Sequence, residues 1–214
     1  SRTFTFVPAA TLAVNRSFAL NLSSGIDYAG NTMTGFAWFF TTSYLADTAA
    51  PQVVSVNPLS GAVAVPRNAR VEVLFNEPVK ATSLGNVTLL RGATPEPVSL
   101  TLSNGNRTLT LTPATLLAAN STYTISVAQV RDLAGNSIAA TFTSSFTTNT
   151  FTDLVTPTVT AITPPYNDTG VPTNVVVQVR FSEPIDPVGF GTSTFRIGHA
   201  SGGGFLPATV VLSS

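Results

Sequence analysis

The stretch DTAAPQVVSVNP (residues 47–58) begins, and TFTSSFTTN (141–149) ends, a segment with the pattern of one small β-sandwich. Its apolar and polar residues alternate in short runs, as in half-buried strands, and turn signals rich in Gly, Pro and Asn separate the runs. Only PATLLAAN (113–120) is expected to form a helical turn, because proline suits the first turn of a helix. The pattern predicts an all-β sandwich with seven strands, at 52–57, 70–76, 86–91, 97–103, 107–112, 121–130 and 138–148.

The beginning of this segment is repeated at the C-terminal end of the chain, and internal repeats reveal the units from which a chain is built. A shift of 106 residues places Asp47 on Asp153 and VEVLFNEPV (71–79) on VQVRFSEPI (177–185) without a gap. The later match to PATVVLS (207–213) needs a shift of 110, which predicts a longer loop at 201–204. Strands are expected in this copy at 158–163, 175–182, 193–197 and 207–213.

The end of the segment is repeated at the N-terminal end of the chain. A shift of 105 residues places DLAGN (132–136) on DYAGN (27–31), and the closing SSFTT (144–148) matches WFFTT (38–42). Strands are expected in this part at 2–7, 15–23 and 33–42. The chain is therefore expected to hold one complete sandwich and one that is split between its two ends.

The repeats predict five segments. These are the C-terminal half of a sandwich at 1–43, a linker at 44–50, a complete sandwich at 51–149, a linker at 150–156 and the N-terminal half of a sandwich at 157–214. Both ends of the chain correspond to the turn at 103–106, so residue 214 of one copy can run into residue 1 of another nearly without a gap. Each half leaves apolar side chains uncovered, and burying one such side chain is worth about 1.5–3 kcal/mol. We expect neighbouring copies to complete the halves head to tail, as swapped separate chains or as repeats of one long chain.

The composition restricts the partners. Charged residues make up 9% of the chain, the formal net charge is zero and Lys80 is the only lysine. Such a surface disfavours nucleic acid and anionic membranes, and no stretch is apolar enough to insert into a bilayer. The chain has no cysteine, so disulfides and thiolate metal sites are excluded. A Thr-, Ser- and Asn-rich chain of this kind is expected outside a bacterial or archaeal cell, secreted or at the cell surface.

Three motifs resemble those of bacterial immunoglobulin-like (Ig-like) domains in S-layer proteins and large surface adhesins. They are a proline four residues after an aspartate (Pro51, Pro157), the F-[NS]-E-P box (75–78, 181–184) and the D-x-A-G-N turn (27–31, 132–136). The resemblance covers nearly the whole chain and implies tandem Ig-like sandwiches. It implies no particular activity, because such modules serve as spacers, stalks, lattice units and appendages of enzymes.

Five carboxylates are candidates for binding calcium, which prefers oxygen ligands: Glu77, Asp132, Asp47, Glu183 and Asp153. The two glutamates stand in strands that are otherwise apolar. The alternative interpretation is structural, because Glu-Pro ends a strand and the aspartate of the D-x-A-G-N turn, as in Asp27, bonds backbone amides ahead of it. The absence of a D-x-D-x-D-G loop favours the structural interpretation.

The sequence shows no catalytic constellation. His199 is the only histidine, whereas a catalytic triad needs a base and a group that orients it. The glycines at 202–204 precede neither a helix nor a lysine, as a phosphate loop would, and Trp38 is expected in the core. Six asparagines begin N-x-[ST] sequons and are candidates for glycosylation: Asn15, Asn21, Asn86, Asn106, Asn120 and Asn167. We therefore expect no enzyme, and no cofactor other than calcium.

These observations predict a structural repeat unit of an extracellular filament, stalk or surface layer, which polymerises or continues head to tail with copies of itself. The alternative is a spacer or binding module of a large secreted adhesin or polysaccharide-degrading enzyme, whose chemistry lies on other segments. Surface glycans are a further candidate partner.

Overall fold

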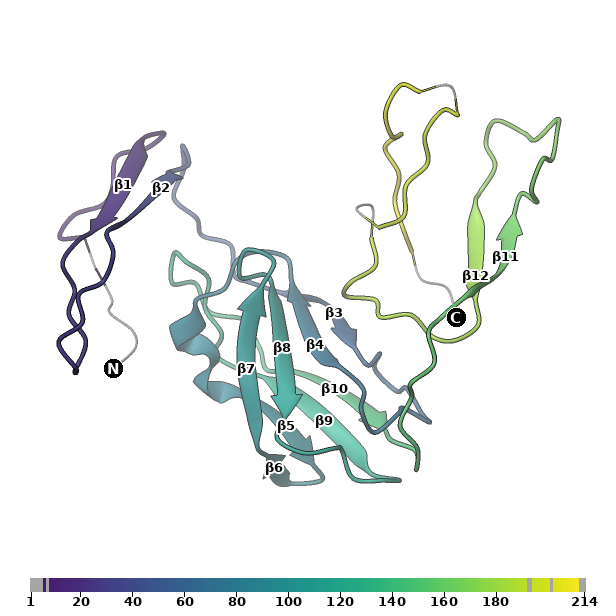
Figure 1. Ribbon diagram of the computed structural model, residues 1–214, viewed down its shortest axis with the longest axis horizontal. Helices are drawn as coiled ribbons and strands as arrows, with labels where there is room; N and C mark the ends of the chain where they lie inside the picture. Colours follow the sequence, from purple (N-terminus) through teal and green to yellow (C-terminus); the bar gives the residue numbers. More distant parts are fainter. Residues whose placement is uncertain (1–5, 7, 192–193, 201, 212–214) are drawn as a thin grey trace. The chain divides into compact units, whose positions relative to one another are not determined.

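The structure is a computed structural model that describes residues 6, 8–191, 194–200 and 202–211 (Figure 1). Apart from one short 3-10 helix, the regular elements of this part of the chain are β-strands. The predicted all-β class is therefore confirmed. The chain divides into two compact units, Ser1–Thr48 (the N-terminal unit) and Ala49–Ser214 (the larger unit). Within the described residues, no helix combines the length and apolar character that crossing a membrane requires.

Most of the larger unit is a sandwich of two antiparallel sheets, called here the central sandwich (residues 53–147). The strand order is β3-β4-β8-β7 in one sheet and β10-β9-β5-β6 in the other. The first sheet contains β3 (Val53–Asn57), β4 (Val71–Phe75), β7 (Val98–Ser103) and β8 (Thr108–Pro113). The second contains β5 (Val87–Arg91), β6 (Thr94–Glu96), β9 (Thr122–Val127) and β10 (Phe142–Thr147). Two packed antiparallel sheets of this size are the arrangement of an immunoglobulin-type sandwich.

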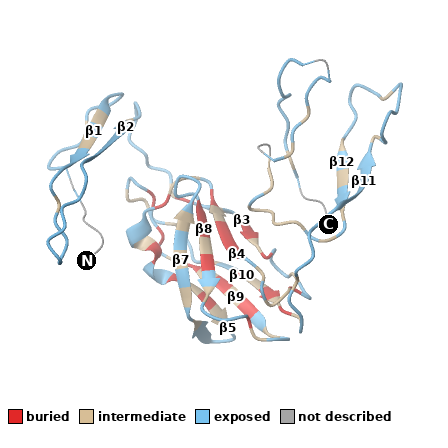
Figure 2. Ribbon diagram, viewed as in Figure 1, coloured by how far each residue is buried: buried red, intermediate tan, exposed pale blue. Residues whose placement is uncertain are grey.

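The core of this sandwich follows from the alternation in its strands. Val71, Val73 and Phe75 of β4 are at most 1% exposed, because successive side chains of a strand point to opposite faces. Tyr123 and Ile125 of β9 line the facing sheet in the same way. The buried residues, red in Figure 2, all fall within residues 51–148, in the central sandwich, its connecting loops and the residues next to its two ends. The core of the described chain therefore belongs to this sandwich alone.

Two expectations for the central sandwich are wrong. PATLLAAN forms no helical turn, because Leu117 N donates to Arg67 O and Ala118 N donates to the Tyr123 hydroxyl, so tertiary bonds replace helical ones. The strand expected from residue 138 begins only at Phe142, and Ile138 instead bonds back to Val130 O. Two short elements were not expected: β6 and the 3-10 helix Ala81–Asn86, which buries Leu84.

The N-terminal unit contains one antiparallel hairpin, β1 (Ser17–Leu22) with β2 (Phe36–Thr41). The strand expected at 2–7 lies outside the described residues except for Phe6, which is in no strand. Trp38 was expected in the core, but it is 61% exposed. The reason is that a two-stranded hairpin has no second sheet to cover its apolar face.

The C-terminal part of the larger unit contains the hairpin of β11 (Val159–Thr163) and β12 (Gln178–Phe181). The described residues of the strands expected at 193–197 and 207–213 are in no strand; residues 193, 212 and 213 lie outside the described part. A single bridge between Gly198 and Phe205 flanks the glycine-rich segment in which the longer loop was expected. The five-segment division of the chain stays a prediction.

Hairpins that occupy equivalent repeat positions have the same local structure. Val53 faces Phe75 in β3–β4, and Val159 faces Phe181 in β11–β12, and each pair is followed by a β-bulge. The cis peptide bonds before Pro58 and Pro164 are also equivalent. The repeated residues therefore encode these hairpins locally.

Candidate functional site

The D-x-A-G-N turn of the larger unit holds a buried carboxylate. Asp132 is 1% exposed, and its Oδ1 accepts bonds from Gly135 N at 2.6 Å and Asn136 N at 2.9 Å. Its Oδ2 accepts a bond from Asn136 Nδ2 at 2.7 Å. Gly135 has a φ of 102°, which glycine adopts without steric cost. The Asp132 carboxylate therefore holds the turn by bonding the backbone amides ahead of it.

Glu77 lies beside this turn. Val79 forms a bridge with Asp132, and Lys80 N donates to Arg131 O at 2.7 Å, so backbone pairing positions the end of the F-N-E-P box. Carboxylate oxygens of Glu77 and Asp132 lie within 4.8 Å of one another. Two carboxylates at this spacing are part of the ligand set that calcium prefers.

Asp47, the third calcium candidate of this copy, belongs to the N-terminal unit and is exposed there. Calcium binding by Asp47, Glu77 and Asp132 stays a prediction.

Asp153, in the linker after the central sandwich, and Glu183, just after β12, form a second carboxyl pair. Asp153 is fixed by Asn68, whose Oδ1 accepts from Asp153 N at 2.9 Å and whose Nδ2 donates to Asp153 O at 2.6 Å. Burial and the neighbouring Asp153 carboxyl raise the pKa of Glu183. Oε1 of Glu183 is buried and has no hydrogen-bond partner among the described residues. A neighbouring carboxyl group disfavours the ionised form of Glu183, and calcium binding by this pair also stays a prediction.

The equivalent turn of the N-terminal unit is exposed and shares with the buried turn both bonds from the asparagine four residues on. Asp27 Oδ1 accepts from Ala29 N and from Asn31 N, each at 2.8 Å, and Oδ2 accepts from Asn31 Nδ2 at 2.8 Å. The bonds from Asn31 are the main reason that the pKa of Asp27 is lowered. The turn therefore forms from its own residues, whether it is buried or exposed.

The six sequon asparagines are all exposed, and glycosylation at these positions stays a prediction. Four of them adopt positive φ: Asn15, Asn106, Asn120 and Asn167. His199 is exposed, ahead of the glycine-rich loop.

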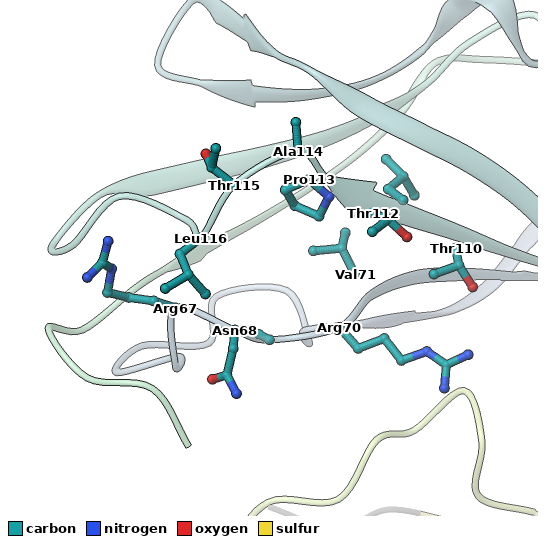
Figure 3. Close-up of a pocket in the computed structure, with 12 residues that line it drawn as sticks. Arg67, Asn68, Arg70, Val71, Thr110, Thr112, Pro113, Ala114, Thr115 and Leu116 are labelled. Carbon is teal, nitrogen blue, oxygen red and sulfur yellow. The ribbon is translucent and has the colours of Figure 1, made fainter. Parts of the chain in front are cut away.

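A surface hollow of about 450 Å³ lies between residues 67–71 and 110–116 of the central sandwich (Figure 3). Its walls carry Arg67, Arg70 and threonine hydroxyls beside apolar groups such as Leu116. Arg67 Nε donates to Leu117 O at 2.7 Å, and Arg70 pairs with Glu72 at 2.7 Å. No carboxylate, histidine or lysine lines the hollow, so its described lining residues supply no general base.

The sequence analysis missed Glu72, a buried acid in the middle of β4. Glu72 is 2% exposed, pairs with Arg70, and accepts a bond from Thr110 Oγ1 at 2.8 Å. Burial raises the pKa of Glu72, and the nearby Asp186 carboxyl acts in the same direction. A carboxylate inside the run VEVLF was the signal that could have identified it.

The family of the central sandwich follows from comparison with known domains. Residues 47–148 match the model of the family described as bacterial Ig-like domain. Residues 47–148 are a bacterial Ig-like domain. The resemblance proposed from the three motifs is thereby confirmed for this segment.

Solved structures similar to the chain include two of an S-layer protein. Surface layer protein SbsC, domains 1–6, is 25% identical with a TM-score of 0.38, over 54% of this chain and 15% of that chain. The N-terminal part of the bacterial S-layer protein SbsC has the same identity and TM-score, over 54% of this chain and 26% of that one. PcoC, a methionine-rich copper resistance protein from Escherichia coli, is 20% identical with a TM-score of 0.38, over 47% of this chain and 100% of that one. The matches span at most about a quarter of these SbsC chains, and no curated protein matches the sequence.

Proposed function

We propose that the chain is a structural repeat unit of an extracellular filament, stalk or surface layer. In this proposal the Ig-like domain is a complete building block. The segments before and after it are halves of a second Ig-like domain, which form a whole only when two copies meet.

The observation that carries the proposal is a pair of stacked rings that occurs twice. In the Ig-like domain, the rings of Tyr123 and Phe146 lie 5.6 Å apart, and each residue is 1% exposed. At the equivalent repeat positions, Phe18 and Phe40 stack at 5.7 Å, but Phe40 is 45% exposed. The β1–β2 hairpin therefore presents the inner face of an Ig-like sheet without the sheet that covers it.

Both halves expose large apolar side chains at repeat positions that are buried or half-buried in the Ig-like domain; the equivalent of Ile162, for example, is Val56, which is 5% exposed. Phe36 and Trp38 are 55% and 61% exposed in the N-terminal unit, and Val159 and Ile162 of β11 are each 53% exposed. Contiguous apolar surface of this kind is typical of faces that a partner covers. Full burial of an exposed side chain of this size is worth about 1.5–3 kcal/mol, and covering these half-exposed side chains recovers part of that, so two copies gain stability by meeting there.

The edge of β12 supports the same pairing. In the Ig-like domain, β4 pairs with β3 on one side and with β8 on the other, with Val73 opposite Leu109. Among the described residues, the equivalent strand β12 pairs only with β11. By the repeat, the open edge of β12 is the place where the strand expected from the sequence at residues 2–7 of another copy would add. A strand added to an open edge supplies backbone hydrogen bonds together with side chains for the core.

The geometry of the Ig-like domain favours a line of copies. Gln52, at its start, bonds to Asn76 at one end of the first sheet. Thr148, at its end, bridges Val65 near the other end. The chain thus enters and leaves the Ig-like domain at opposite poles, and we infer that different copies complete the halves. Such head-to-tail contacts do not close on themselves and generate a filament, either of separate chains or of repeats along one longer chain.

We place this assembly outside a bacterial or archaeal cell. The chain has no cysteine and one lysine and carries zero formal net charge, and its central segment belongs to a bacterial domain family. The alternative, a spacer or binding module of a secreted adhesin or polysaccharide-degrading enzyme, requires no pairing between the halves.

Light scattering coupled to size-exclusion chromatography tests the proposal. We expect the purified chain to form species that grow with concentration in steps of about 22 kDa, and to form filaments in negative-stain images. Val179→Asp, on β12, should abolish growth, whereas Leu133→Asp, in an exposed turn of the Ig-like domain, should not. A single species of about 22 kDa at every concentration would refute the proposal.

A further inference from the structure

We infer that a parallel backbone ladder locks assembled copies together. Residues 167–174 of one copy pair with residues 39–47 of another, and the side chain of Asn174 holds the backbone of Asp47. This inference rests on the proposed function. It adds the register in which two segments of different copies pair, and a side-chain contact that fixes the linker of the incoming copy.

The template for this ladder lies inside the Ig-like domain. Residues 61–68 run parallel to residues 145–153, along the edge of β10 and into the linker that follows it. The two segments exchange backbone bonds: Gly61 N to Ser145 O, Thr147 N to Ala62 O, Val65 N to Thr147 O, Asn149 N to Val65 O and Arg67 N to Phe151 O. The linker therefore leaves the domain as a paired strand.

A side-chain clamp ends the ladder. The amide group of Asn68 bonds both the N–H and the C=O of Asp153. The side-chain amide of Asn68 takes the place of a backbone partner for Asp153. It thereby fixes the direction in which the linker leaves the domain. A carboxamide can do this because it carries a donor and an acceptor side by side.

The accepting segment of the C-terminal half already has the shape of the template. Residues 61–68 read GAVAVPRN, and the equivalent residues 167–174 read NDTGVPTN. Gly61 and Ala64 have φ values of 79° and 56°, and the equivalent Asn167 and Gly170 have 62° and 73°. Positive φ is uncommon outside glycine, so its recurrence at both positions shows that the backbone of this segment is formed in advance of any partner.

The turn that follows is also the same. Ala69 N donates to Pro66 O at 3.0 Å, and Val175 N donates to Pro172 O at 3.1 Å. Asn174 therefore occupies the place of Asn68 in sequence and in backbone conformation.

The incoming segment is formed in advance as well. Residues 145–153 read SFTTNTFTD, and the equivalent residues 39–47 read FFTTSYLAD. Thr148 Oγ1 donates to Ala118 O at 2.7 Å, and the equivalent Thr42 Oγ1 donates to Ala13 O at 2.6 Å. Residues 39–47 are thus held within their own unit by the same side-chain bond that holds residues 145–153 in the Ig-like domain.

The expected bonds follow from the repeat. Between two copies they are Asn167 N to Phe39 O, Thr41 N to Asp168 O, Val171 N to Thr41 O, Ser43 N to Val171 O and Thr173 N to Leu45 O. The Asn174 amide then holds the N–H and C=O of Asp47. The joint between assembled units would accordingly be stiff, and its angle would match the one after the Ig-like domain.

Cysteine cross-linking tests the register, because the chain has no cysteine of its own. Thr173→Cys and Leu45→Cys are made in separate chains, which are mixed and treated with a short bis-maleimide. We expect a cross-linked dimer from this mixture. Thr173→Cys mixed with Asn21→Cys, an exposed position on β1, should give little product.

The clamp has its own matched pair of variants. Asn174→Ala should weaken association about tenfold, since it removes two hydrogen bonds from the contact between copies. Asn68→Ala makes the same change within one chain and should leave association unchanged.

The results separate the two proposals. Association measured by light scattering, without the Thr173–Leu45 cross-link and without an effect of Asn174→Ala, would overturn the ladder and leave the completed domain standing. No association at all would overturn both.

Discussion

At the scale of single residues, comparison of the two D-x-A-G-N turns shows that the motif determines the hydrogen bonds of the turn, whereas the surrounding domain determines its burial. Asp27 and Asp132 accept the same side-chain bond from the asparagine four residues later. The motif therefore sets the turn, and the sequence was sufficient to predict it. The burial of Asp132 depends on the rest of the Ig-like domain, which the motif does not encode.

Asp132→Ala should destabilise the Ig-like domain by about 3 kcal/mol. The variant removes the buried carboxylate and leaves the amides of the half-buried Gly135 and Asn136 without their acceptor, and the loss of such a bond costs about 1–3 kcal/mol. Urea unfolding followed by circular dichroism measures the change. Asp27→Ala deletes the same group from the exposed turn and should leave the unfolding midpoint of the Ig-like domain unchanged. Equal losses in the two variants would contradict this account.

Glu72 could not have been placed from sequence, since strand alternation puts it on the outer face of its sheet, where exposure is expected. Its raised pKa predicts a specific pH dependence. A carboxyl group whose pKa is higher in the folded state stabilises the fold at low pH. That contribution is lost as pH rises from the ordinary carboxyl value through the pKa in the folded state.

Glu72→Gln should therefore be stabilising relative to the wild type at neutral pH and neutral in effect at acidic pH. The glutamine keeps an acceptor for Thr110 and removes the charge, and Gln178 stands at the equivalent position of β12. Thermal unfolding between about pH 4 and pH 7 measures the difference in Tm. Glu96→Gln, in the surface pair with Arg91, is the control and should change Tm little at any pH. A difference that shrinks as pH rises would contradict the assignment.

At the scale of elements, strands were predictable where alternation and turn signals coincide. The strands expected at residues 70–76 and 97–103 are found at Val71–Phe75 and Val98–Ser103. β6 was missed because Thr94–Glu96 has no apolar alternation and forms by pairing with β5. The strands expected at 193–197 and 207–213 are not formed in their described residues, because a strand needs a neighbour to satisfy its backbone. The local sequence pattern predicts which residues can form strands. Whether they form one depends on an adjacent strand that can pair with their backbone.

The equivalent rings Phe146 and Phe40 should respond differently to the same truncation. Phe146→Ala opens a cavity beside Tyr123 and should cost the Ig-like domain about 3–5 kcal/mol. Phe40→Ala, at a position that is 45% exposed, should leave that unfolding transition unchanged and should reduce association between copies. Urea unfolding measures the first effect and sedimentation velocity the second. If Phe40→Ala leaves association unaltered, the hairpin face is not the contact.

At the scale of the whole molecule, the sequence predicted one complete sandwich because every strand of that copy lies within 51–149. The proposed split domain accounts for the uncovered faces at both ends, since in that proposal each end carries only part of a strand set. How copies meet depends on surfaces that only a second copy can cover. Trp38 reports on that step, because it is the only tryptophan, is 61% exposed and occupies the repeat position of Ser144, which is 3% exposed.

The emission of Trp38 should shift to shorter wavelength as the protein concentration rises. Completion of the split domain transfers the indole from water to an apolar interior, and the Ig-like domain contributes no tryptophan signal of its own. Fluorescence spectra recorded across a dilution series, together with light scattering of the same samples, measure the coupling between assembly and burial. Val179→Asp, which places a charge on β12, should hold the emission at the long-wavelength limit at all concentrations. Particles that grow while the emission stays unchanged would mean that copies associate through another surface, and the split domain would then have to be abandoned as the basis of assembly.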